Sequence, residues 1–277
     1  MLSHALDNTP GLDDARIITE FPAGLSHRSW LLDSAIGEVV VRIDTPEASA
    51  LKLDRRFESD VLRHIANADL APELLWVDLE RGIQVTRYLP GRIWVQDDLS
   101  VTENFVRLAT RMALLHDLPL VGLRSDRVEI LRSYAAINAS EAADRLLADA
   151  AALSHELDET NPCDLVLCHG DVHVGNIIDD GELRLIDWEY AGTTHRALDL
   201  AAFARQQELT EMQLSAFLGA YEGEAGAMGS KEFALACALY DCTVLLWLSA
   251  IHIVQPSIAG VLRVSGRYRD DLAILLG

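Results

Sequence analysis

HGDVHVGN, residues 169–176, and LRLIDWEYAG, residues 183–192, are the two segments that most strongly indicate the fold. In the first segment, Asp171 and Asn176 stand five positions apart in a loop of His and Gly. In the second segment, Asp187 lies eleven residues after Asn176, at the end of an apolar run. This order predicts a loop followed by a hairpin that brings the two aspartates and the asparagine together.

These three side chains have the chemistry of a phosphoryl-transfer site. Transfer to an alcohol needs a carboxylate that orients the hydroxyl and accepts its proton, and Asp171 suits that role. It also needs hard oxygen ligands that hold Mg²⁺ against nucleotide phosphates, which Asn176 and Asp187 offer. Taken singly, each residue also fits a structural role, as a helix cap or in an Asx turn. Their combined spacing favours the functional interpretation.

Composition excludes several classes of partner. The 277 residues carry a net charge of -20, from 43 acidic and 23 basic residues, which disfavours binding to nucleic acid or anionic lipid and suits a cationic substrate. The four cysteines form no CxxC pair, and no HExxH segment occurs, so the sequence indicates neither a disulfide framework nor a zinc hydrolase. The N-terminus lacks a basic and an apolar signal region, and the apolar run 243–254 contains a His and is shorter than a bilayer span. We expect a cytoplasmic protein with no membrane partner.

The N-terminal third reads as a small antiparallel sheet with one helix. Apolar residues at helical spacing predict that helix over 48–67, before Pro72. Glycines in the connecting segments favour tight turns. Strands are expected at 16–21, 29–34, 39–44, 73–79 and 83–89.

The character changes to long Ala/Leu-rich helical patterns after Pro90-Gly91, which we interpret as the boundary between two lobes, 1–89 and 90–277. An exception is 164–187, where the apolar runs DLVLC and LRLID bracket the loop, with Asp179-Asp180-Gly181 as the hairpin turn. Helices are expected at about 99–117, 126–158, 196–222 and 231–254, the last one buried.

Five segments resemble one known family. They are AGLSHRSWLL, VVVRI, TRYLPG, HGDVHVGN and LIDWEYAG with LDLAAF behind it. Together they resemble the aminoglycoside phosphotransferase and choline kinase superfamily, relatives of the protein kinases, and are most similar to its bacterial thiamine kinase and choline kinase branches. The resemblance implies an α/β (α+β), two-lobed protein-kinase-like fold. The small antiparallel-sheet lobe with one helix would bind the nucleotide, and the larger, mainly helical lobe would carry the catalytic loop and the acceptor site.

The resemblance also implies roles for individual residues. Gly24, Leu25 and Ser26 would form the turn over the phosphates of ATP, although one Gly stands where protein kinases have three. Arg42 occupies the position where the wider superfamily usually has Lys, and Glu58 matches the helix carboxylate that pairs with this cation. ATP would lie beside 86–91, which includes Arg87 and Tyr88, and His169 would support the loop.

The acceptor is expected to be a small cationic alcohol. Carboxylates and aromatic faces both attract such a cation, which makes Glu189, Trp188, Tyr190 and Trp247 candidates, with Tyr240 a further one. Glu189 can instead serve a second Mg²⁺. We expect transfer of the γ-phosphoryl group from MgATP to thiamine, with choline or ethanolamine second and an aminoglycoside third; the nucleotide can also be GTP. The rival from another class is a nucleotide-binding pseudokinase.

Overall fold

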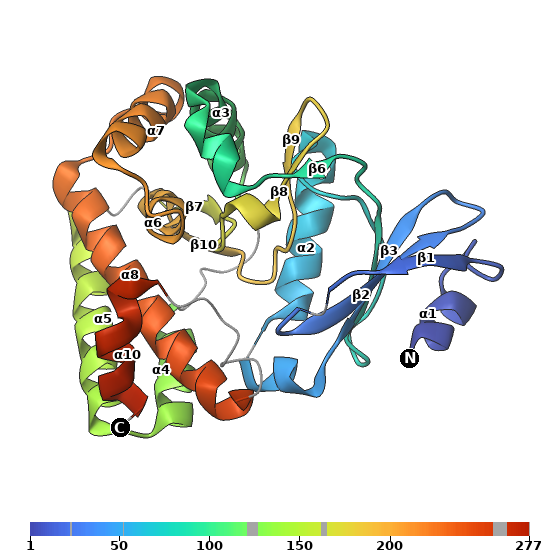
Figure 1. Cartoon of the computed structure of the whole chain (residues 1–277), viewed down its shortest axis with the longest axis horizontal. Helices are drawn as coiled ribbons and strands as arrows, with labels where there is room; N and C mark the ends of the chain where they lie inside the picture. The colour runs from blue at the N-terminus through green and yellow to red at the C-terminus, as the bar shows by residue number, and fades with distance from the viewer. Residues whose placement is uncertain (23, 52, 121–126, 162–164, 257–264, 277) are drawn as a thin grey trace. The chain divides into compact units, whose positions relative to one another are not determined.

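The computed structural model describes residues 1–22, 24–51, 53–120, 127–161, 165–256 and 265–276. The chain forms two compact units (Figure 1). The first comprises 1–95 and 174–191, and the second comprises 96–173 and 192–277. The segment 174–191 thus belongs to the N-terminal unit, although it begins within the loop 169–176. The lobe boundary at residue 90 stays a prediction.

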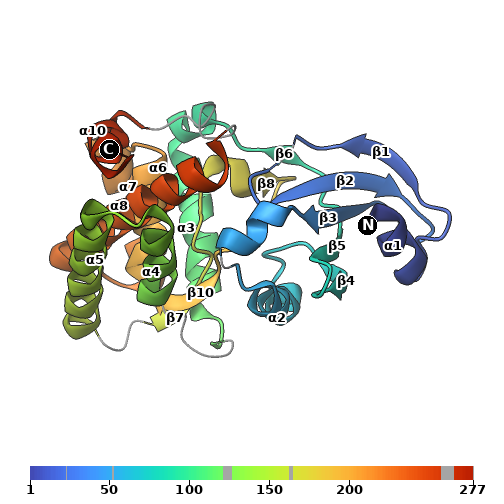
Figure 2. The same ribbon diagram turned by 90° about the horizontal axis from the view of Figure 1, so that it is seen from below.

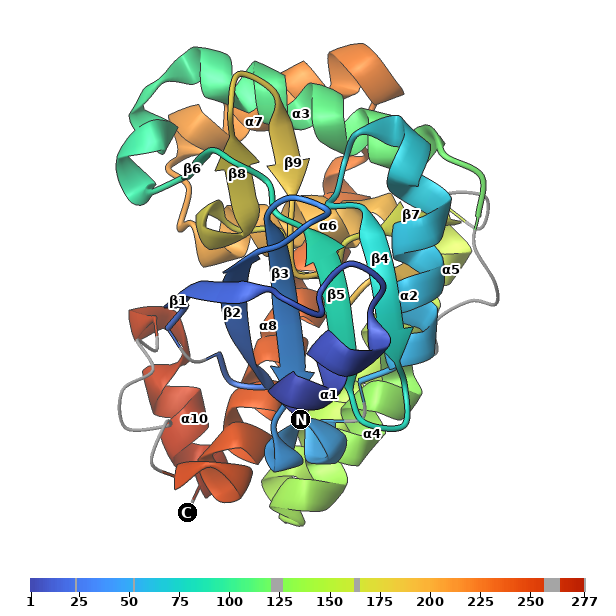
Figure 3. The same ribbon diagram turned by 90° about the vertical axis from the view of Figure 1, so that its right-hand side faces the viewer.

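A five-stranded antiparallel sheet in the order β1-β2-β3-β5-β4 forms the centre of the first unit (Figure 3). The five predicted strands are confirmed. One face of β3 buries Val39, Val41 and Ile43 against Val85 of β5, as the period of two along a strand requires. The strands are β1 (Arg16–Glu20), β2 (His27–Asp33), β3 (Val39–Asp44), β4 (Leu74–Asp78) and β5 (Ile83–Arg87).

Two helices accompany this sheet, where the sequence predicted one. The additional helix, α1 (Leu2–Asn8), places Ala5 in the core of the sheet. The predicted helix over 48–67 is wrong at its start, because α2 spans only Arg55–Ile65, after a 3₁₀ helix at Pro46–Leu51. The side chain of Asp54 accepts the Phe57 N–H at 2.9 Å and so fixes the start of α2.

A second sheet in the same unit carries the predicted hairpin. Its order is β6-β8-β9, from β6 (Arg92–Ile93), β8 (Ile177–Asp179) and β9 (Leu183–Leu185). Gly181 in the turn has φ 110°, which glycine adopts readily. The Leu185 N–H donates to the Leu70 carbonyl at 2.8 Å, which ties the hairpin to the segment after α2.

The second unit is mainly helical (Figure 2), and its described residues include one strand pair. Two predicted helices are each divided. Residues 126–158 break at Ala139, whose φ is 53°, before Ser140 caps the next helix, and 196–222 break before the capping box of Thr210. The elements are α3 (Thr102–Asp117), α4 (Arg127–Asn138), α5 (Glu141–Thr160), β7 (Leu165–Cys168), β10 (Gly192–His195), α6 (Arg196–Gln206), α7 (Glu211–Ala225), α8 (Ser230–Val254) and α10 (Arg269–Leu276).

The 25-residue helix α8 packs against α4, α5 and α6. By length and composition alone α8 is long and apolar enough to cross a membrane, as the core helix of a soluble protein also can be. However, 61% of its most apolar window is buried within the protein. The predicted buried helix is therefore confirmed, and it begins one residue before the predicted range.

Candidate active site

Asp199 of α6 anchors the backbone of the predicted catalytic loop. One carboxylate oxygen accepts the His169 N–H and the other accepts the Gly170 N–H, both at 2.8 Å. His116 of α3 lies 3.2 Å from the same carboxylate and 2.7 Å from the Tyr221 hydroxyl. Burial opposes ionisation of Asp199, but the hydrogen bond and charge of His116 lower its pKa. A buried carboxylate with several donors thus fixes the loop directly before Asp171.

Replacement of Asp199 by Asn tests this anchor. An amide has one accepting oxygen, so one loop N–H loses its partner and faces an NH₂ group. We expect the free energy of unfolding to fall by roughly 1.5–3 kcal/mol, the contribution of a hydrogen bond to a charged group. Urea denaturation of this variant, beside Asp149→Asn on the exposed face of α5, measures the difference. Equal stability of the two variants would exclude the anchoring role.

Asp171 is held in place and still partly accessible. Its Oδ1 accepts from Gln206 Nε2 at 2.6 Å, and its Oδ2 lies 3.6 Å from His173 Nε2. The Asp171 N–H donates to Nδ1 of the buried His169 at 3.2 Å. The side chain of Asp171 is 26% exposed, so this carboxylate is partly accessible to solvent.

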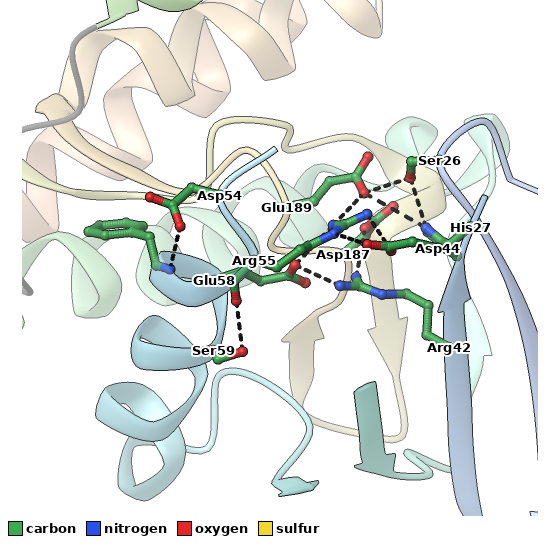
Figure 4. A network of polar contacts seen from close by, with 11 residues as sticks. Ser26, His27, Arg42, Asp44, Asp54, Arg55, Glu58, Ser59, Asp187 and Glu189 are labelled. Atoms are coloured by element: carbon green, nitrogen blue, oxygen red, sulfur yellow. Dashed lines mark hydrogen bonds and ion pairs between the residues drawn. The ribbon is translucent and has the colours of Figure 1, made fainter. Parts of the chain in front are cut away.

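Arg42 of β3 and Glu58 of α2 form a buried ion pair in the first unit (Figure 4). Arg42 Nη2 donates to Glu58 Oε2 at 2.6 Å, and the two side chains are 10% and 2% exposed. Burial opposes the ionised form of Glu58, but the charge and hydrogen bond of Arg42 lower its pKa. The structure thus brings together the cation and the helix carboxylate that the sequence analysis paired.

Asp187 and Glu189 lie beside this pair. Arg42 Nη1 is 3.6 Å from Asp187 Oδ1. His27, Asp187 and Glu189 each offer one atom that could bind a metal ion, and these three atoms lie within 4.8 Å of one another. Asp187 and Glu189 do not lie on a strand, because β9 ends at Leu185. Asp187 instead has φ 65°, and a turn after it brings Glu189 back to the same cluster.

Glu189 is held from two sides. Its Oε2 accepts from the Ser26 hydroxyl at 2.7 Å and from Arg55 Nη1 at 3.0 Å. Burial opposes ionisation, but the hydrogen bond from His27 and the charge of Arg55 lower the pKa of Glu189 to about 2. In this arrangement Glu189 is an ionised carboxylate next to Asp187.

The charges of the cluster fit a divalent cation. Four carboxylates (Asp44, Glu58, Asp187 and Glu189) face two guanidiniums (Arg42 and Arg55), so acidic side chains outnumber basic ones by two. Burial and the charge of Glu189 raise the pKa of Asp187 to about 7. Its Oδ1 is buried and has no hydrogen-bond partner among the residues that the structure describes. Carboxylate oxygens are the ligands that Mg²⁺ prefers, so Asp187 and Glu189 could hold it.

The raised pKa of Asp187 predicts how stability depends on pH without Mg²⁺. Its value is about 7 in the folded protein against 3.8 for an ordinary aspartate, so between these limits the folded state binds more protons than the unfolded state. Stability should therefore fall as pH rises from about 4 to 7. Urea denaturation at pH 5 and pH 8 should show a larger loss for the wild type than for Asp187→Asn. A parallel loss in both would assign the pH dependence to other groups.

Asn176 ends a 3₁₀ turn at Val174–Asn176, just before β8, and is 6% exposed. Its carbonyl accepts the Ile186 N–H at 3.0 Å, which joins the start of the hairpin to the residue before Asp187. Metal binding by Asn176 stays a prediction.

The residues expected to bind ATP have structural contacts of their own. The Gly24 N–H donates to the His27 carbonyl at 3.1 Å, which closes the turn that contains Leu25 and the buried Ser26. The Arg87 guanidinium binds Glu73, and the Tyr88 N–H donates to the Glu38 carbonyl at 3.0 Å. Nucleotide binding by these residues stays a prediction.

The aromatic candidates differ in exposure. Trp188 is 1% exposed, and its indole N–H donates to the Leu185 carbonyl at 2.9 Å, which favours packing over acceptor binding. Tyr190 and Trp247 are half-buried, and Tyr240 is buried on α8. Burial and the nearby charge of Asp171 raise the pKa of Tyr240 well above its usual value. Acceptor binding by Trp188, Tyr190 and Trp247 stays a prediction.

The sequence analysis missed four residues that the structure connects to these clusters: His27, Arg55, Asp199 and Gln206. Arg55 offered one signal, because it stands one helical turn before Glu58. Asp199 offered another, because it is an acid within the apolar segment LDLAAF.

Comparison with known proteins agrees with the resemblance seen in the sequence. A model of the phosphotransferase enzyme family matches residues 17–232. Thiamine kinase from Escherichia coli (strain SMS-3-5 / SECEC) is 33% identical over 193 residues, which are 67% of this chain and 65% of the relative. The match thus spans just under two thirds of the length of that thiamine kinase.

Solved structures show the same fold. Choline kinase LicA from Streptococcus pneumoniae has a TM-score of 0.75 at 20% identity, over 94% of this chain and 92% of that one. LicA in complex with AMP has a TM-score of 0.76 at 20% identity, over 99% and 95% of the two chains. The predicted two-lobed, protein-kinase-like fold is confirmed. Since the family model covers most of the sequence, the chain belongs to the phosphotransferase enzyme family.

Proposed function

We propose that this protein is an ATP-dependent small-molecule kinase. It transfers the γ-phosphoryl group of ATP to a hydroxyl of a small cationic alcohol, most readily thiamine. The observation that carries the proposal is the buried Arg42–Glu58 pair beside Asp187 and Glu189. This cluster joins a fixed cation for phosphate to oxygen ligands for a divalent metal, the two elements that phosphoryl transfer requires.

Each residue has a defined task in this proposal. Arg42, held by Glu58, neutralises phosphate oxygens, and Asp187 with Asn176 holds Mg²⁺. The bound Mg²⁺ supplies positive charge that offsets the charge of the phosphates. Asp171 orients the acceptor hydroxyl and accepts its proton, and Asp199 keeps the loop before Asp171 in place.

Thiamine is the first choice of acceptor because relatives that carry the name thiamine kinase are 33% identical to this chain. Choline or ethanolamine is second, supported by the fold shared with a choline kinase. An aminoglycoside is third. All four acceptors are cations, which the net charge of -20 favours. Nucleotide use is supported by the shared fold of LicA, which has been solved with AMP.

A panel of acceptors tests the proposal. The protein is incubated with MgATP and thiamine, choline, ethanolamine or an aminoglycoside, and both ADP and the phosphorylated product are measured. We expect thiamine to give the highest kcat/KM. An uncharged alcohol that matched these cations would contradict the cationic acceptor. Nucleotide binding without any product would favour the pseudokinase, although Asp171, Asn176 and Asp187 are all present.

A further inference from the structure

Arg55, at the start of α2, binds carboxylates from three separate segments (Figure 4). Its Nη2 lies 2.7 Å from Asp44 Oδ1 at the end of β3. Its Nη1 lies 3.0 Å from Glu58 Oε2 within α2 and 3.0 Å from Glu189 Oε2 after β9. The side chain is only 13% exposed, so these ion pairs are shielded from solvent.

Arg55 shares both of its inner partners with groups of the proposed nucleotide site. Glu58 Oε2 accepts from Arg55 and also from Arg42 at 2.6 Å. Glu189 Oε2 accepts from Arg55 and also from the Ser26 hydroxyl at 2.7 Å. The Arg55 guanidinium thus connects Glu58, which holds Arg42, with Glu189, which lies next to Asp187.

We propose that Arg55 is a positioning residue that fixes Glu58 and Glu189 together and thereby couples nucleotide binding to Mg²⁺ binding. This inference rests on the proposed function. A planar guanidinium can present several N–H groups to separate carboxylates in fixed directions, whereas an ammonium acts as a single compact charge. The three carboxylates therefore depend on the planar geometry of the Arg55 guanidinium and not only on its charge.

Arg55→Lys separates geometry from charge. If only the positive charge of Arg55 mattered, Lys would substitute for it without loss of the coupling. Loss of that charge, which repels Mg²⁺, would even strengthen Mg²⁺ binding. If Arg55 positions Glu58 and Glu189, Lys should weaken the coupling although the charge is kept. The quantity to measure is the ratio of ADP affinities with and without Mg²⁺, by calorimetry, which needs neither an acceptor nor catalysis.

We expect this ratio to fall roughly tenfold or more in Arg55→Lys, as for loss of a charged hydrogen bond. The matched control is Arg56→Lys, the neighbouring exposed arginine on the same helix, which should keep the wild-type ratio. A ratio in Arg55→Lys within twofold of wild type overturns the inference. A wild type without any Mg²⁺ effect on ADP overturns the proposed metal role as well, so the two failures are distinguishable.

Two further variants test the inference in case Arg55→Lys does not fold, and thermal unfolding measures whether each variant is folded. Asp44→Asn loosens Arg55 without removing it, and the ratio should fall in the same direction by a smaller factor. Glu189→Gln should lower the ratio, and adding Arg55→Lys to it should cause less further loss than Arg55→Lys causes alone. Additive effects of the two changes would show that Arg55 does not act through Glu189.

Discussion

Asp171→Asn should lower kcat by roughly 10²- to 10⁴-fold, the usual scale of general acid–base catalysis, while nucleotide affinity changes little. The amide can still accept a hydrogen bond but cannot take a proton from the acceptor hydroxyl. Asn has nearly the same size as Asp, so the new side chain still fits beside Gln206 and His173. Steady-state kinetics with thiamine and calorimetry with ADP measure the two effects.

The matched control for this result is His173→Asn, which changes a neighbour of Asp171 in the same loop. It should leave kcat within a few-fold of wild type, because His173 lies 3.6 Å from Asp171 and has no assigned role in the transfer. Unchanged turnover in Asp171→Asn would remove Asp171 from the role of base. A large loss in both variants would indicate a disturbed loop.

Asp187→Ala is expected to abolish activity and to weaken MgATP binding far more than metal-free ATP binding. Asp187 is proposed to hold Mg²⁺, so its loss removes an oxygen ligand and one negative charge of the cluster. Titration of ATP with and without Mg²⁺, in wild type and variant, measures the difference. An equal change in both titrations would contradict the assignment.

Asp180→Ala provides the control, since Asp180 lies in the turn of the same hairpin and pairs with Arg184. Removal of this partly exposed ion pair should cost little stability and leave the Mg²⁺ effect intact. Asp187→Asn is a useful companion, because it removes the charge and keeps a side chain of the same shape.

The strands were predictable because they are short apolar runs, and glycines mark most of the turns between them. Helix boundaries were less predictable, because single side chains such as Asp54 and Ser140 fix them by capping. The break at Ala139 depends on one residue with φ 53°, which no apolar pattern reveals.

The candidate site was predictable where its residues lie in characteristic short segments. Arg42, Glu58 and Asp187 came from such segments together with the resemblance, and they lie together in the first unit. Arg55 was missed because one partner, Glu189, lies 134 positions away in sequence. A contact between such distant segments is determined by tertiary packing and leaves no local pattern.

The left-handed backbone conformation of Asp187 limits which amino acids can replace it during evolution. With φ at 65°, side chains that branch at Cβ are strongly disfavoured, whereas Asp, Asn and Gly are tolerated. If Asp187 binds metal as proposed, a duplicated copy that no longer needs this function would still be restricted to these residues by its backbone. We therefore expect copies that have lost the metal to carry Asn or Gly at position 187, and Val or Ile to be absent there even when activity no longer matters.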